Sequence, residues 1–363
     1  MEAKLHPNKL ESCRALSLGS LPPRSLALTT KHWTYQGPSA GDLDSVREAG
    51  DKAAASFCSH PAAGCSWPAA VPASPREWQG LEDFTALSTI TQNQEHTVYV
   101  GTASKICKGP STVIIKAFGK ARLGRSSAAL HSFCVEKRLL LTLQHNHIIR
   151  GLGCFEDPAE QYVVQEYADG RNIRQYLAYW LRKRQDCPPA RPSTVVPERD
   201  IVNLILRPLL DALAYLHRQG IAHRDVKPEN AVLTHGGCVK LIDFGLAVDV
   251  HEMKYACMAG TLQYMSPEVA SGVPVETGLI DRADVWGIGV MAFQLLCGKL
   301  PLFHECRSVL REMLMECEIP WDALDAAAAS QQGVDFVRRA LCQDPRLRPT
   351  AAELLLHDWI TGN

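Results

Sequence analysis

Two short polar runs in the second half of the chain constrain its fold and its chemistry most. Residues 223–230 read HRDVKPEN and residues 243–245 read DFG. Between them, two short stretches rich in aliphatic and β-branched residues flank the turn signal at 234–237, which predicts a β-hairpin. This hairpin brings three polar side chains to one edge: Asp225, Asn230 and Asp243. Two carboxylates and an amide offer the hard oxygen ligands that Mg²⁺ prefers, and one carboxylate can serve as a base.

The overall composition excludes several classes of protein. The 363 residues carry 38 Lys and Arg against 39 Asp and Glu, a formal net charge of −1, so we expect neither nucleic acid nor a membrane as a partner. No apolar run reaches the roughly 18–20 residues that a membrane helix needs. The 13 cysteines form no C-x-x-C pair and are expected to be reduced, which favours a cytoplasmic or nuclear location.

The first part of the chain differs from the rest in composition and in hydrophobic periodicity. Residues 1–84 are rich in Pro, Gly, Ala and Ser and lack periodicity, which predicts a disordered or weakly structured tail. The basic start of this tail leaves an organelle-targeting peptide open as the alternative. From 85 to 361, strand-like segments come first, and helical patterns follow after Gly170. This order predicts an α+β fold with a small β-rich lobe and a larger helical lobe.

Periodicity also predicts individual elements. Short apolar or β-branched runs indicate strands at 97–100, 112–116, 148–149 and 162–164. Helices are expected at 128–144, at 201–216 and at 351–359. Pro208 lies inside the second of these helices and is expected to kink it.

Taken together, the motifs resemble those of the eukaryotic protein kinase family, of the Ser/Thr type. The run HRDVKPEN is similar to the family's catalytic loop, and DFG is similar to its metal-binding motif. Further matches follow in the family's order: 113–116 (VIIK), Glu136, 264–268 (YMSPE), 284–289 (DVWGIG) and 344–350 (DPRLRPT). The resemblance implies a bilobal protein-kinase fold over 85–361, with an N-lobe of about 85–166 and a C-lobe of about 167–361.

The resemblance also implies a role for each candidate residue in phosphoryl transfer from ATP to a protein hydroxyl. Asp225 would accept the hydroxyl proton, Lys227 would neutralise the moving phosphoryl group, and Lys116 would hold the α- and β-phosphates. The implied Mg²⁺ ligands are Asn230 and Asp243. The implied ATP-binding residues are Lys116, its partner Glu136, Val98, Ile114, Glu166, Ala168 and Val232. ATP and Mg²⁺ are thus the implied cofactors, a protein is the implied substrate, and the expected oligomeric state is a monomer.

The nucleotide site departs from the family pattern in two places. The three glycines of the family's glycine-rich loop fall on Thr91, Asn93 and His96, and none of these is Gly. Glu95 adds a negative charge near the polyphosphate, and Ile114 replaces a smaller residue above the adenine ring. Two interpretations stay open: an active Ser/Thr kinase, or a pseudokinase scaffold with weak or absent ATP binding.

Regulation and substrate choice are less constrained by the sequence. Residues 246–259 contain no Ser or Thr, so activation by phosphorylation of a Ser or Thr in this interval is not expected. Cys257 stands where a phosphorylated residue is expected and is an inert or a redox-sensitive thiol. The basic, Pro-rich segment 182–194 is a solvated insert or a docking loop. Glu229 hints at basic residues near the target hydroxyl, although Asn172 replaces an acidic residue that would strengthen this preference.

Overall fold

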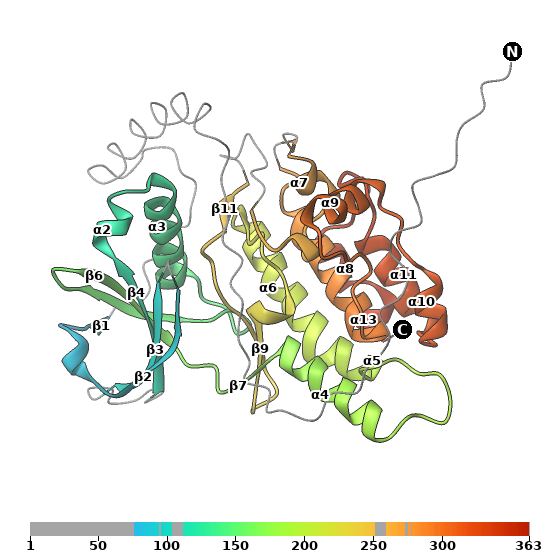
Figure 1. Ribbon diagram of the computed structural model, residues 1–363, viewed down its shortest axis with the longest axis horizontal. Coiled ribbons are helices and arrows are strands. Elements are labelled where there is room, and N and C mark those ends of the chain that lie inside the picture. The colour runs from blue at the N-terminus through green and yellow to red at the C-terminus, as the bar shows by residue number, and fades with distance from the viewer. Residues whose placement is uncertain are drawn as a thin grey trace, which may run out of the picture.

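The computed structural model describes residues 76–93, 96–103, 112–250, 259–272, 275–276 and 278–362. In these residues the chain forms two lobes, one built on a β-sheet and one built on helices (Figure 1). The prediction of an α+β, bilobal architecture is therefore confirmed. Within the same residues, no helix is both long enough and apolar enough to cross a membrane.

The small lobe is a six-stranded sheet with two helices beside it (Figure 1). Its strand order is β1-β5-β6-β4-β3-β2, and all neighbours are antiparallel except β1 and β5. The strands are β1 (Arg76–Glu77), β2 (Phe84–Gln92), β3 (Thr97–Ala103), β4 (Thr112–Gly119), β5 (Gly151–Glu156) and β6 (Glu160–Glu166). A 3-10 turn, η1 (Leu81–Asp83), precedes β2, and the helices are α2 (Lys120–Leu123) and α3 (Ser127–Thr142).

Side-chain alternation along β4 decides which residues lie on each face of the sheet. Val113 and Ile115 are fully buried in the apolar cluster on one side of the sheet. Lys116 and Phe118 point to the opposite side because successive residues of a strand alternate. There Phe118 packs on Phe133 of α3, with ring centroids 4.9 Å apart. The strand therefore aims Lys116 at the face that α3 covers.

Aromatic side chains tie the start of the described chain to the small lobe. β1 pairs in parallel with β5, and Trp78, which is 7% exposed, lies with its ring centroid 4.7 Å from that of Phe84. Phe84 in turn stacks on Phe155, which stacks on Tyr162. Residues 76–84, which the sequence analysis places in the tail, are thus built into the small lobe. A two-residue strand and one Trp carry no periodicity that the sequence could display.

Replacing Trp78 with Ala should lower the free energy of unfolding by about 2 kcal/mol. Truncating a buried Trp typically costs about 3–5 kcal/mol, and we expect less here because a terminal segment can detach locally. Denaturant unfolding of the wild type and the variant measures this change. The nearby substitution Gln79→Ala, which truncates an exposed side chain, is the control and should change stability by less than about 0.5 kcal/mol. Equal stabilities of Trp78→Ala and Gln79→Ala would show that residues 76–84 do not stabilise the lobe.

The large lobe is a set of helices joined by short strands and turns. The longer helices are α4 (Ile173–Asp186), α6 (Arg207–Arg218), α8 (Arg282–Cys297), α9 (Arg307–Glu316) and α11 (Gln331–Ala340). The shorter ones are α5 (Glu198–Asp200), α7 (Pro267–Ser271), α10 (Asp322–Ala326), α12 (Ala351–Leu355), α13 (Asp358–Thr361), the π-helix η2 (Ile201–Leu206) and the 3-10 turns η3 (Pro228–Asn230) and η4 (Leu262–Tyr264). The strands are β7 (Gly170–Asn172), β8 (Ile221–Ala222), β9 (Ala231–Thr234), β10 (Val239–Leu241) and β11 (Val248–Asp249).

Helix α8 lies at the centre of this lobe. Its residues from Asp284 to Phe293 are all buried, including Trp286 at 0% exposure. A helix that is buried on all sides must be apolar all round, which matches the long apolar run of its sequence. The predicted hairpin also forms: β9 and β10 pair antiparallel, and Gly237 supplies the left-handed backbone of the turn with φ +77°.

Three element predictions differ from the structure. Residues 148–149 do not form a strand, and Ile148 makes a single bridge to Leu241. The helix predicted at 351–359 is split into α12 and α13, because His357 caps the second helix by accepting the N–H of Trp359. Pro208 lies at the start of α6, directly after the π-helix η2, where its missing N–H removes a regular helical hydrogen bond.

Candidate active site between the lobes

A buried ion pair joins the sheet of the small lobe to its long helix. Lys116 of β4 bonds to Glu136 of α3, and both side chains are more than nine-tenths buried. The Nζ atom of Lys116 also lies 3.3 Å from Oδ1 of Asp243. Burial by itself would lower the pKa of Lys116, but the carboxylates of Asp243 and Glu136 outweigh burial and raise it above the ordinary value for lysine. Lys116 is therefore held as a cation that faces the large lobe.

Asp243 projects from the end of the hairpin toward this cation. It follows β10 with a left-handed backbone, φ +69°, while the next residue, Phe244, is fully buried. The ammonium of Lys116 lowers the pKa of Asp243 well below its usual range. Ser132 of α3 donates to the carbonyl oxygen of Gly245, which fixes the segment after Asp243 against the small lobe. The carboxylate is ionised, and its side chain is 42% exposed, so it remains accessible to a ligand.

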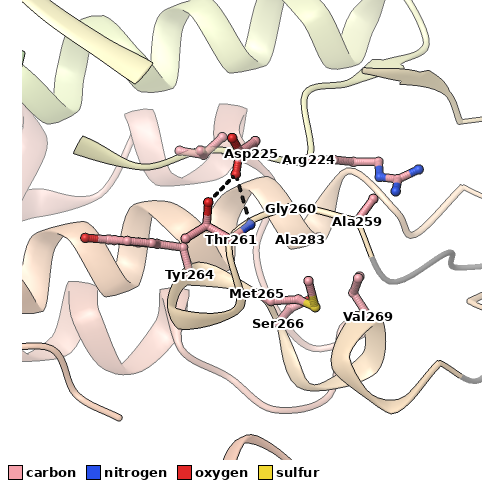
Figure 2. Close-up of a pocket in the computed structure, with 11 residues that line it drawn as sticks. Arg224, Asp225, Ala259, Gly260, Thr261, Tyr264, Met265, Ser266, Val269 and Ala283 are labelled. Atoms are coloured by element: carbon pink, nitrogen blue, oxygen red, sulfur yellow. Dashed lines mark hydrogen bonds between the residues drawn. The ribbon is translucent and has the colours of Figure 1, made fainter. Parts of the chain in front are cut away.

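The second carboxylate, Asp225, lies at the centre of a hydrogen-bond network in the large lobe. Its Oδ2 accepts from Lys227 Nζ at 2.5 Å and from Asn230 Nδ2 at 2.9 Å. Its Oδ1 accepts from the backbone N–H of Thr261 at 3.1 Å and from the Thr261 hydroxyl at 3.0 Å (Figure 2). Lys227 Nζ also donates to the Thr261 hydroxyl oxygen at 2.7 Å. Asp225, Lys227 and Thr261 thus form one continuous polar network, as the roles assigned to the first two require.

Gly260 allows Thr261 to approach so closely. Its backbone has φ +113°, a conformation that other residues rarely adopt. A Cβ at this position would lie 2.8 Å from the carbonyl oxygen of Arg224, so a larger residue would push Thr261 away from Asp225.

The core of the large lobe holds the loop that carries Asp225. The buried carboxylate of Asp284, in α8, accepts the backbone N–H of His223 at 2.8 Å and that of Arg224 at 2.7 Å. It also bonds to His217 Nε2 at 2.9 Å. Burial would raise the pKa of Asp284, but these bonds and the two nearby histidines give a net lowering. Arg224 itself has a left-handed backbone, φ +67°, which these contacts hold in place.

Asn230 and Asp243 present the kind of oxygen atoms that a divalent cation prefers. Both donor bonds that are formed by the Asn230 amide nitrogen go to Asp225, to its carbonyl oxygen and to its carboxylate. This arrangement uses the nitrogen of the Asn230 amide and leaves its oxygen for another partner. Mg²⁺ typically takes one or two protein ligands and completes its shell with water and phosphate oxygens. The two residues therefore fit Mg²⁺ together with a polyphosphate.

The residues predicted to surround adenine lie where the sheet meets the large lobe. Ile114 pairs with Gln165 across β4 and β6, and Val98 of β3 pairs with Lys116, so these side chains share the face of Lys116. Val232 is in β9. Glu166 is the last residue of β6, and Ala168 follows it by two positions. The side-chain oxygen of Gln165 is buried and has no hydrogen-bond partner among the described residues. A buried acceptor of this kind fits a ligand that carries an N–H donor.

Two positions of the segment that lacks glycine, Asn93 and His96, bond to each other. The backbone N–H of His96 donates to the Asn93 side-chain oxygen at 2.8 Å, and the Asn93 N–H donates to the His96 carbonyl oxygen at 3.2 Å. Asn side chains commonly bond to the nearby backbone in this way. Thr91 continues β2 and pairs with Val98. Glu95 and Cys257 lie outside the described residues, so the predictions for them stay predictions.

Two further ion pairs surround the site. Arg348 and Glu268, expected from the motifs to pair, form a bidentate bond of 2.7 and 3.0 Å, with Arg348 fully buried. At the edge of the site, Arg174 Nη1 donates to Glu229 Oε1 at 2.9 Å. Sequence reasoning missed this second pair, because the two residues are separated by 55 positions and neither belongs to a pattern that names the other.

Known proteins resemble this chain over most of its described length. It matches the family model of the protein kinase domain over residues 96–360. It is 29% identical over 253 residues to serine/threonine-protein kinase cds1 of Schizosaccharomyces pombe, which is 68% of this chain and 52% of that protein. Calcium/calmodulin-dependent protein kinase type 1 of Macrobrachium nipponense is 30% identical over 264 residues, 72% of this chain and 70% of that protein. Aurora kinase C of Mus musculus is 29% identical over 287 residues, 79% of this chain and 95% of that protein. The chain thus spans about half the length of the first of these relatives.

Proposed function

This chain belongs to the protein kinase family, and we propose that it is a catalytically active Ser/Thr protein kinase that uses ATP and Mg²⁺. The observation that carries the proposal is the joint arrangement of five side chains: Lys116 paired with Glu136, Asp243 beside Lys116, and Asp225 in contact with Lys227. Phosphoryl transfer needs positioned positive charge and an oriented hydroxyl more than covalent chemistry. These groups supply both requirements at one place between the lobes.

Each side chain has a distinct part in the proposed reaction. Lys116 binds the α- and β-phosphates of ATP, and Glu136 keeps its ammonium group directed at them. Asn230 and Asp243 hold Mg²⁺, which neutralises phosphate charge when it is bound. Asp225 orients the target hydroxyl and accepts its proton. Lys227 places its positive charge next to Asp225, where the transferred group gains negative charge.

The choice of Ser or Thr over Tyr is supported by the contacts of Lys227 and Thr261. Lys227 reaches both Asp225 and the Thr261 hydroxyl, so the cation lies within about one hydrogen bond of the base. This arrangement suits a short aliphatic hydroxyl, whose oxygen must come close to Asp225. The relatives that carry "serine/threonine-protein kinase" in their names support the same choice.

The missing glycines favour a second candidate function, that of a pseudokinase scaffold. Thr91, Asn93 and His96 place Cβ atoms where a polyphosphate backbone contact would otherwise be closest. Against this alternative, Asn93 and His96 bond to each other without glycine, and the acidic residues and the lysine of the site are all retained. We therefore propose kinase activity, with weakened binding of the phosphates of ATP.

Transfer of label from γ-³²P-ATP to a mixed protein substrate tests the proposal. We expect Mg²⁺-dependent labelling of Ser and Thr by the wild type, and loss of labelling in Asp243→Ala and in the presence of EDTA. Nucleotide binding, measured by thermal shift with and without Mg²⁺, separates the two candidates further. A wild type that transfers no more label than Asp243→Ala is not a kinase under these conditions, and the scaffold function is then the better assignment.

A further inference from the structure

The ion pair between Arg174 and Glu229 lies beside the position of the target hydroxyl. Glu229 belongs to the turn η3, and its neighbour Asn230 bonds directly to Asp225. A residue that flanks the phosphorylated Ser or Thr must therefore pass close to Glu229. Arg174, in the first turn of α4, contacts this carboxylate from the solvent side, with 72% of its side chain exposed against 31% for Glu229.

Two polar side chains of the described elements that meet the turn η3, those of Tyr264 and Asn172, are neutral. Burial raises the pKa of the Tyr264 hydroxyl, and the nearby negative charge of Glu229 raises it further. That hydroxyl donates to the neutral amide oxygen of Gln294 at 2.7 Å. Asn172, the neutral residue before α4, uses its side chain to cap the helix. Arg174 and Glu229 therefore cancel, and the outermost charge at this edge is the guanidinium of Arg174.

We propose that Arg174 makes this kinase select targets with acidic rather than basic residues beside the phosphorylated hydroxyl; the inference rests on the proposed kinase function. A basic residue of the target finds Oε1 of Glu229 paired with Arg174 and Oε2 buried, and it meets the like charge of Arg174. An acidic residue of the target binds the exposed side of the guanidinium, which has five N–H donors and bonds to Glu229 through Nη1. Glu229 thus acts as the group that positions Arg174, and the preference suggested by Glu229 alone is reversed.

A matched set of peptides tests the inference. Each peptide carries one Ser acceptor and one substituted flanking position, with either Asp or Arg at that position. For each position the ratio of kcat/KM for the Asp peptide to that for the Arg peptide is measured with the wild type, with Arg174→Ala and with the control Arg171→Ala. Arg171 is an exposed arginine of β7, three residues away in sequence, while the ion pair of Glu229 is made with Arg174.

We expect a ratio above one for the wild type at one or more flanking positions. In Arg174→Ala the same ratio should fall by at least about threefold, through a change in KM, because one exposed charge contact is lost and Glu229 is uncovered. Arg171→Ala should keep the wild-type ratio. A wild type that prefers Arg peptides, or a ratio that Arg174→Ala leaves unchanged, overturns the role of Arg174 while the kinase function stands. If the wild type labels none of the peptides and no mixed protein substrate, the proposed function itself fails.

Discussion

Replacing Asp225 with Asn should slow phosphoryl transfer by about 10²–10⁴-fold, the usual contribution of a positioned general base. The substitution keeps the size of the side chain and removes the negative charge that four donors now share: Lys227, Asn230 and the two donor groups of Thr261. Because Asp225 does not contact Lys116, Asp243 or the residues predicted to surround adenine, the affinity for ATP should change little. The loss should therefore appear in kcat and not in the KM for ATP.

Steady-state kinetics with the mixed protein substrate measures both constants. The matched control is Asp186→Asn, which makes the same chemical change at an exposed residue at the end of α4 and should retain wild-type kcat. If Asp225→Asn retains more than about a tenth of wild-type kcat, well above the range for a general base, Asp225 is not the base of the reaction.

Replacing Arg348 with Met should lower the free energy of unfolding by about 3–5 kcal/mol, the cost of breaking a buried ion pair by removing one partner. The substitution leaves Glu268 without its bidentate partner. It also removes donors from three backbone carbonyls, those of Arg282, Cys342 and Gln343. The guanidinium further lies 5.1 Å from the ring centroid of Trp286, at the centre of the lobe. No water can replace these contacts easily, because Arg348 is only 1% exposed.

Urea unfolding of the wild type, Arg348→Met and Arg346→Met tests this prediction. Arg346 lies two residues away in the same loop and pairs with Glu276, but its side chain is 70% exposed. An exposed pair of this kind contributes only about 0–1 kcal/mol, so Arg346→Met should unfold close to the wild type. If the two variants lose the same small amount of stability, the Arg348–Glu268 pair does not hold the large lobe together.

The sequence predicts the centre of the site far better than its surroundings. Asp225, Lys227 and Asn230 lie within one continuous run, and the hairpin that brings Asp243 back to them is local, so pattern and geometry agree. Lys116 and Glu136 were also predicted as partners, because each stands at a defined place on a strand or a helix. The predicted role of each of these six residues remains a proposal, but the structure bonds them in two groups: Lys116 with Glu136 and Asp243, and Asp225 with Lys227 and Asn230.

What the sequence could not show depends on contacts between distant segments. Trp78 joins the small lobe through aromatic packing with Phe84, and no periodic pattern surrounds it. The Arg174–Glu229 pair forms only because α4 and the turn η3 meet in the folded lobe. The break between α12 and α13 is hidden for the opposite reason: Leu356 reads as a helical apolar position, yet it is 77% exposed. Local patterns report local structure, and the first two of these features depend on tertiary contacts.

The left-handed backbones of Arg224 and Asp243 set stability and activity against each other. Each conformation costs about 1 kcal/mol or more for a residue that carries a Cβ, and glycine would avoid this cost. A selection for thermal stability alone would thus tolerate glycine at 224 and 243, although at 243 it would delete the carboxylate beside Lys116. Variants that are selected for thermal stability and must also stay active should therefore gain their stabilising changes elsewhere. The requirement for catalysis keeps the two strained residues in place.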